Sequence, residues 1–102
     1  MDVRVTKRTQ AQIDRAAHWW DENRDRAPEA FDEDLAKAFL LLTAEPRVGA
    51  PVVSARSQGV RRLHLARIRY HLYYRIRGGV VEVLALWHTS RGSVPGAMSQ
   101  HP

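Results

Sequence analysis

Histidine is the residue of this sequence best suited to chemistry at neutral pH, where imidazole can act as acid, base or metal ligand. The chain has five histidines. His64, His71 and His88 fall in separate predicted strands, with Glu82 the nearest carboxylate in sequence, and His101 lies near the end of the chain. This spacing does not favour a metal site, so no metal ligand and no cofactor are assigned.

Arginine is concentrated in the second half of the chain. Residues 53–102 hold eight arginines and a single acidic residue, Glu82, whereas residues 1–52 hold eight Lys/Arg and ten Asp/Glu. Arginine pairs with carboxylate or phosphate through two parallel hydrogen bonds. The distribution indicates an anionic partner, either nucleic acid or an acidic protein segment, although a solvated sheet face gives the same composition.

Length and composition restrict the classes of protein. The 102 residues suffice for one domain, and 44% hydrophobic content is typical of a globular core. No apolar run approaches the roughly 18 residues of a membrane span, and the N-terminus lacks a signal pattern, which predicts a cytoplasmic protein without a membrane partner. The absence of cysteine excludes disulfides, thiolate zinc sites, iron–sulfur clusters and cysteine nucleophiles.

Two helices are predicted in the first half. Thr6 or Thr9 can cap the first helix, which continues to about Asn23. Pro28 is suited to the first turn of the second helix, and Pro46 ends it. So short a linker predicts that the two helices pack as an antiparallel hairpin.

The strands are predicted from alternation of apolar and polar residues. Residues 2–6 form a first short strand, and residues 62–66 and 69–77 form two half-buried strands with one polar face. Two glycines at 78–79 provide a tight turn, and residues 80–88 are apolar on both faces, as in a strand inside a sheet.

The remaining segments are predicted to be irregular. Residues 45–59 contain two prolines, two glycines and two serines, which indicates a connecting loop. Residues 92–102 have the composition of a flexible tail, so a single domain is expected over residues 1–91. The predicted order of elements is β-α-α-β-β-β.

Four sequence phrases in this order resemble the ParE/RelE toxin superfamily of bacterial type II toxin–antitoxin systems, and the ParE branch most closely. The resemblance covers about residues 2–91 and lies in LTAEPRVG at 42–49, VRRLHL at 60–65, YHLYYRI at 70–76 and VEVLALWHTSR at 81–91. It implies an α+β fold in which the N-terminal helical hairpin packs on a small, mainly antiparallel sheet.

The resemblance also implies partners. A growth-inhibiting toxin of this kind is neutralised by a cognate, ParD-like antitoxin, whose acidic and partly disordered segment folds as it docks. Operator DNA would be bound only through the antitoxin. We expect the antitoxin to contact the arginine-rich sheet face and the first helix through Trp19, Arg62, Arg69, Tyr73 and Arg75.

ParE-like members poison DNA gyrase by stabilising its cleaved complex with DNA, which requires no catalytic residue in the toxin. The resemblance places the target contacts at the end of the last strand, in Trp87, His88 and Arg91.

RelE-like members are instead ribosome-dependent endoribonucleases that need an acid, a base and phosphate-binding cations but no metal. The corresponding set here is Arg62, His64, His71, His88 and Arg91. The C-terminal catalytic tyrosine of that branch has no counterpart in residues 92–102. A plain basic nucleic-acid-binding domain is a third reading, although no helix is basic along one face.

Single aromatic residues have predicted environments. Trp20 continues the apolar stripe of the first helix, whereas Trp19 lies about 100° away around the helix axis and is a candidate for partner contact. Tyr70 and Tyr74 share the apolar face of their strand, and Tyr73 lies on the face with the arginines. The acidic run at 32–34 is explained by the helix dipole and solubility.

Overall fold

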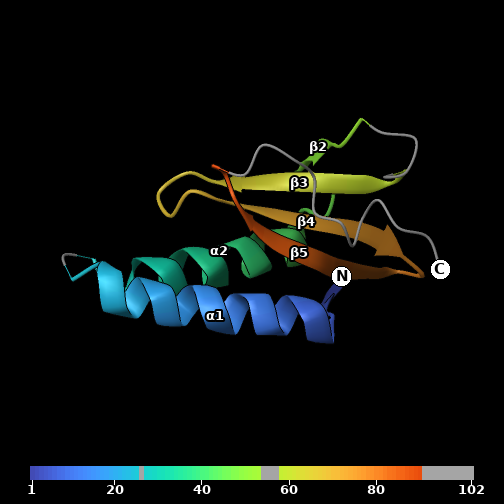
Figure 1. The fold of residues 1–102 in the computed structure, drawn as a ribbon. Helices are drawn as coiled ribbons and strands as arrows, with labels where there is room; N and C mark the ends of the chain where they lie inside the picture. Colours follow the sequence, from blue (N-terminus) through green and yellow to red (C-terminus); the bar gives the residue numbers. More distant parts are fainter. Residues whose placement is uncertain (26, 54–57, 91–102) are drawn as a thin grey trace.

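A computed structural model describes residues 1–25, 27–53 and 58–90 (Figure 1). The elements in chain order are β1 (Asp2–Val5), α1 (Lys7–Asn23), α2 (Ala30–Ala44), β2 (Ala50–Pro51), β3 (Val60–Leu65), β4 (Tyr70–Arg77) and β5 (Val80–His88). The two helices lie side by side and cover one face of the sheet, and no helix of the described residues covers the other face (Figure 1). None of the helices described is long and apolar enough to cross a membrane.

The sheet has the strand order β1-β5-β4-β3-β2. The β1–β5 pair is parallel, and the other three pairs are antiparallel. The predicted α+β class, with a helical hairpin on a mainly antiparallel sheet, is confirmed.

One strand was not predicted. Residues 45–59 were expected to be a loop, but Ala50 and Pro51 form β2 and pair with Arg62 and Arg61 of β3. A strand of two residues shows no alternation, and proline is tolerated there because β2 lies at the edge of the sheet.

The start of α1 is fixed by Thr6. Its hydroxyl accepts a hydrogen bond from the Thr9 backbone N–H at 3.1 Å, which satisfies a free donor of the first turn. Thr9 is fully buried within the helix, and its hydroxyl donates to the carbonyl of Val83 in β5 at 3.2 Å. The two threonines therefore join the beginning of α1 to β5.

Trp20 is buried, as predicted, and it holds the turn between the two helices. Its indole N–H donates to the Ala27 carbonyl at 2.8 Å, and its ring packs 6.3 Å from the ring of Phe31. Pro28 was predicted to lie in the first turn of the second helix, but it belongs to this turn, and α2 begins two residues after it, at Ala30.

A β-bulge shifts the alternation of side chains along β5. Tyr73 pairs with Ala85 but its neighbour Tyr74 pairs with Val83, which leaves Leu84 as an extra residue. Val83 and Leu86 consequently both belong to the core beneath the helices, while Leu84 and Ala85 pack on the other face.

Candidate functional site

The sheet face opposite the helices, hereafter the open face, carries the polar residues of β3 and β4. The strand register aligns His64 with His71 and His71 with Trp87, so these three side chains form one row across β3, β4 and β5. Arg62, Tyr73 and Ala85 form the next row.

His64 and His71 are in direct contact on the open face. Their Nδ1 atoms are 3.4 Å apart, and the ring centroids are 5.0 Å apart. Partial burial, followed by the charges of Arg62 and His64, lowers the pKa of the His71 imidazole below its usual value of 6.5. Within the described residues, no cluster of three or more His, Cys, Asp or Glu side chains exists that could hold a metal ion.

The open face is less available to a partner than the alternation pattern indicated. Tyr73 was predicted to offer antitoxin contact, but it is only 3% exposed and packs with Val60 and Ala85. The guanidinium of Arg75 forms an ion pair with Glu82 of the neighbouring strand at 2.8 Å. Cross-strand packing and charge pairing thus engage two of the five predicted antitoxin contacts.

Arg69 does not lie on the open face at all. It was assigned to the start of the third predicted strand, but it ends the turn between β3 and β4 with a φ of 62°. Its N–H donates to the Leu65 carbonyl at 2.8 Å, and its carbonyl accepts from Thr89 at 2.9 Å. Alternation cannot reveal a left-handed turn residue, which is why the prediction was wrong.

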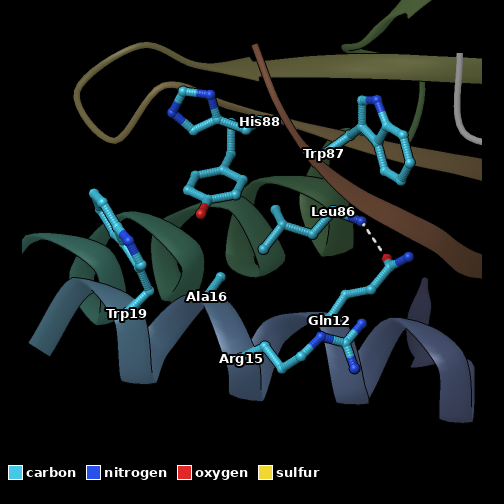
Figure 2. A pocket seen from close by; sticks show the side chains of 8 residues that line it. Gln12, Arg15, Ala16, Trp19, Leu86, Trp87 and His88 are labelled. Carbon is cyan, nitrogen blue, oxygen red and sulfur yellow. Dashed lines mark hydrogen bonds between the residues drawn. The ribbon is translucent and has the colours of Figure 1, made fainter. Parts of the chain in front are cut away.

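A cleft of about 210 Å³ lies between α1 and the edge of β5 (Figure 2). Because β1 pairs only with residues 80–83, the following residues of β5 have no described strand on this side. Gln12 of α1 takes the place of a strand, and its side-chain oxygen accepts a hydrogen bond from the Leu86 N–H at 2.9 Å. Ala16 and Trp19 also line the cleft.

Trp19, the predicted partner contact of the first helix, is 43% exposed and lies where α1 meets the cleft. The guanidinium of Arg24 lies 5.0 Å from the centre of its ring, within the range of a cation–π interaction. A second cleft of about 350 Å³ shares Trp19 and His88 with the first and is also lined by Arg69.

Of the predicted target contacts, Trp87 and His88 point to opposite faces of β5, although both line the cleft at the edge of this strand. Trp87 packs on the open face, whereas His88 lies on the helix side, with its ring 5.1 Å from the ring of Tyr70. Adjacent strand residues point to opposite faces, which explains the separation. His88 Nδ1 accepts a hydrogen bond from the Ser90 N–H at 3.1 Å. Arg91 lies outside the described residues.

The predicted nuclease set is divided in the same way. Arg62, His64 and His71 are neighbours on the open face, but His88 lies on the other side of the sheet. Of the described residues of this set, Arg62, His64 and His71 can therefore contact one phosphate, and Arg91 lies outside the described residues.

Arg67, an exposed arginine of the β3–β4 turn, forms ion pairs within the chain. Its guanidinium binds Asp34 at 2.6 Å and Glu33 at 3.1 Å, which ties the beginning of α2 to the β3–β4 turn. These hydrogen bonds, first to Asp34 and then to Glu33, raise the pKa of the Arg67 guanidinium above its usual value. The acidic run of α2 thus has a role beyond the helix dipole, one that sequence spacing does not reveal.

Comparison with known proteins places this geometry among characterised folds. The family model described as "ParE toxin of type II toxin-antitoxin system, parDE" matches residues 3–92. No curated protein sequence matches the chain. A solved chain from the "Chromosomal ParDE TA system from P. aeruginosa" has a TM-score of 0.69 and 22% identity, with 88% of this chain and 97% of that chain covered. At this identity the likeness shows the fold.

Proposed function

The chain belongs to the ParE toxin family of type II toxin–antitoxin systems, and on this premise we propose that it poisons DNA gyrase and is neutralised by a cognate, ParD-like antitoxin. The match to the ParE branch over residues 3–92 is the observation that supports gyrase as the target. The similar solved chain comes from a ParDE system, which supports an antitoxin of the ParD type.

The two clefts around Trp19 are the proposed docking site of the antitoxin. They combine an exposed indole with the guanidinium groups of Arg15, Arg24 and Arg69. None of these three arginines forms an ion pair with a carboxylate of the described residues. An acidic segment with an apolar side chain satisfies both features, because tryptophan and arginine are the usual anchors of such interfaces.

This location also offers a mechanism of neutralisation. His88, a proposed target contact, lines both clefts together with Trp19. A segment that covers Trp19 therefore covers His88 as well. Antitoxin and gyrase would compete for overlapping surface at the end of β5.

The test is a gyrase assay with the isolated protein. We expect loss of supercoiling together with accumulation of cleaved DNA. Both effects should be absent when the antitoxin is added before the toxin. Cleaved DNA must depend on gyrase, so a reaction without gyrase is the control. A folded toxin that binds its antitoxin but leaves gyrase unaffected, even in excess, would remove gyrase as the target.

Contact between His64 and His71 favours a second candidate function, ribosome-dependent cleavage of mRNA. Two imidazoles 3.4 Å apart can provide a base for the 2′-hydroxyl and an acid for the leaving oxygen. Under this alternative, purified ribosomes programmed with mRNA are cleaved by the protein, and the His64→Gln, His71→Gln double variant is inactive. Intact mRNA at excess protein argues against it.

A further inference from the structure

The C-terminal half of α2 carries exposed apolar side chains. Leu40 is 72% exposed, although it lies in the interior of a regular helix. Three further exposed hydrophobic residues lie beside it, since the Met1 amino group donates to the Thr43 carbonyl at 2.9 Å and Val48 belongs to the turn that follows the helix. One exposed leucine is ordinary in a soluble protein, but a contiguous group indicates an interaction surface. We call this group the α2 patch, and it consists of Met1, Leu40, Leu41 and Val48.

The patch has the shape that a second helix requires. Lys37, Leu40, Leu41 and Ala44 recur at intervals of three and four residues, so they lie along one face of α2, and all four are exposed. Leu41 also lines a groove of about 240 Å³ between α2 and β3, in which Leu63 provides part of the apolar wall. The apolar surface therefore continues from the helix onto the edge of the sheet.

Charged residues flank the two leucines symmetrically. Lys37 lies four residues before Leu41, and Glu45 lies four residues after it. When two identical helices pack antiparallel across a two-fold axis, residues equally far before and after the centre come together. Lys37 of one copy would then meet Glu45 of the other, near the negative C-terminal end of the second helix, which also favours a cation.

A second pair of opposite charges has almost the same centre. Glu33 lies seven residues before Leu40, and Arg47 lies seven residues after it, in the turn beyond the helix. Glu33 accepts a hydrogen bond from Arg67 but remains half-exposed, so it can receive a second guanidinium. Arg47 is exposed and forms no ion pair with a carboxylate of the described residues. This self-complementarity favours a second copy of the chain over an unrelated partner.

We propose that the α2 patch is a self-association surface, on which α2 of two copies packs antiparallel with Leu40 and Leu41 at the two-fold axis. A helix of 15 residues is about 22 Å long, so such a pair buries less than the roughly 1,600 Å² of a standard interface. The dimer is therefore a weak one, with a Kd in the micromolar range. The surface goes beyond the proposed function, because it shares no residue with the clefts around Trp19.

The first experiment measures self-association of the full chain by sedimentation equilibrium over a micromolar concentration series. We expect a reversible monomer–dimer equilibrium whose Kd rises at least about tenfold in Leu40→Glu. Val53→Glu is the matched control, because Val53 is 98% exposed but lies outside the α2 patch, and it should associate like the wild type. Cooperative thermal unfolding verifies that each variant is folded.

The second experiment exchanges the charges. Lys37→Glu and Glu45→Lys should each weaken the dimer, because each places like charges opposite one another. The double variant Lys37→Glu, Glu45→Lys should restore association close to that of the wild type. Further weakening in the double variant would contradict the antiparallel alignment.

The third experiment tests the position of the axis by disulfide cross-linking, since the chain has no cysteine of its own. Leu40→Cys should cross-link two copies under mild oxidation, because the two sulfurs lie next to the axis. Ala44→Cys should not, since its two copies are separated by about 10 Å along the helices. Equal cross-linking of both variants would refute the arrangement.

Two further results would overturn the proposal. A dimer that is weakened equally by Leu40→Glu and Val53→Glu would indicate general surface adhesion. A wild-type protein that stays monomeric throughout the series, with an antitoxin affinity that is reduced by Leu40→Glu, would assign the α2 patch to the antitoxin. Neither result would affect the gyrase assay, so this proposal and the proposed function can fail independently.

Discussion

The hydroxyl of Tyr74 accepts a hydrogen bond from the backbone N–H of Gly49 at 2.8 Å, within the buried part of the sheet. Tyr74 is fully buried, and Gly49 precedes β2. A Cβ atom at residue 49 would lie 2.7 Å from the Tyr74 oxygen and 3.0 Å from the carbonyl of Arg62. The contact therefore requires glycine, and it attaches β2 to the sheet edge.

The first prediction concerns the tyrosine. Tyr74→Phe should lower the free energy of unfolding by about 1–3 kcal/mol, because a buried N–H loses its acceptor. Denaturant unfolding measures the change. Tyr73→Phe is the control on the same strand, since the Tyr73 hydroxyl has no hydrogen bond within the described chain, and its effect should be much smaller.

The second prediction concerns the glycine. Gly49→Ala should destabilise the protein by about 1–3 kcal/mol through overpacking against Tyr74. The combined Gly49→Ala, Tyr74→Phe variant should lose less than the sum of the two single changes, because removal of the hydroxyl removes the closest contact. Strict additivity in a double-mutant cycle would contradict this contact.

The third prediction concerns the edge of β5. Gln12→Ala should lower stability by about 1 kcal/mol and increase hydrogen exchange at the Leu86 amide, whose acceptor is lost. Gln12→Glu keeps an acceptor oxygen and should preserve the protection of that amide. Unchanged exchange in Gln12→Ala would mean that the side chain does not cap this edge.

The fourth prediction is a pH dependence of stability. The lowered pKa of His71 means that the folded protein binds fewer protons than the unfolded chain between that pKa and 6.5. Stability should therefore fall as the pH falls through this window. In His71→Gln this part of the dependence should disappear, whereas His18→Gln, on the exposed surface of α1, should retain it. Urea unfolding at about pH 5.5 and about pH 7.5 compares the variants.

The fifth prediction concerns the antitoxin. Trp19→Ala should weaken its binding by about 2 kcal/mol, or roughly thirtyfold, if the indole is a central anchor. Arg69→Glu should also weaken binding, because it reverses a charge beside the same cleft. Arg77→Ala, distant from the cleft, should bind like the wild type in calorimetric titration. Equal affinities for all variants would place the antitoxin elsewhere.

Much of the fold follows from local pattern. Three patterns indicated which side of an element is buried. They are the apolar stripe that includes Trp20, the alternation around Leu72 and Tyr74, and the apolar run of β5. Such periodicity is a property of one element at a time. The phrases around these elements were also sufficient to indicate the toxin superfamily.

Local pattern was misleading where a residue serves a contact distant in sequence. Nothing in the neighbourhood of Arg75 or Tyr73 reveals that Glu82 pairs with one and that Val60 and Ala85 cover the other. Arg69 reads as part of a strand, yet its backbone closes a turn. Availability for a partner depends on what the rest of the chain leaves uncovered.

The sequence by itself determined the two helices, four of the five described strands, the helix side of the sheet and the family, because each depends on the order and spacing of residue types. Tertiary structure decided which polar residues meet. It brought His64 to His71, placed Trp19 at the same cleft as His88 and engaged Arg67 with Asp34. Strand register and the packing of the helices on the sheet set these contacts, and both join segments that are remote along the chain.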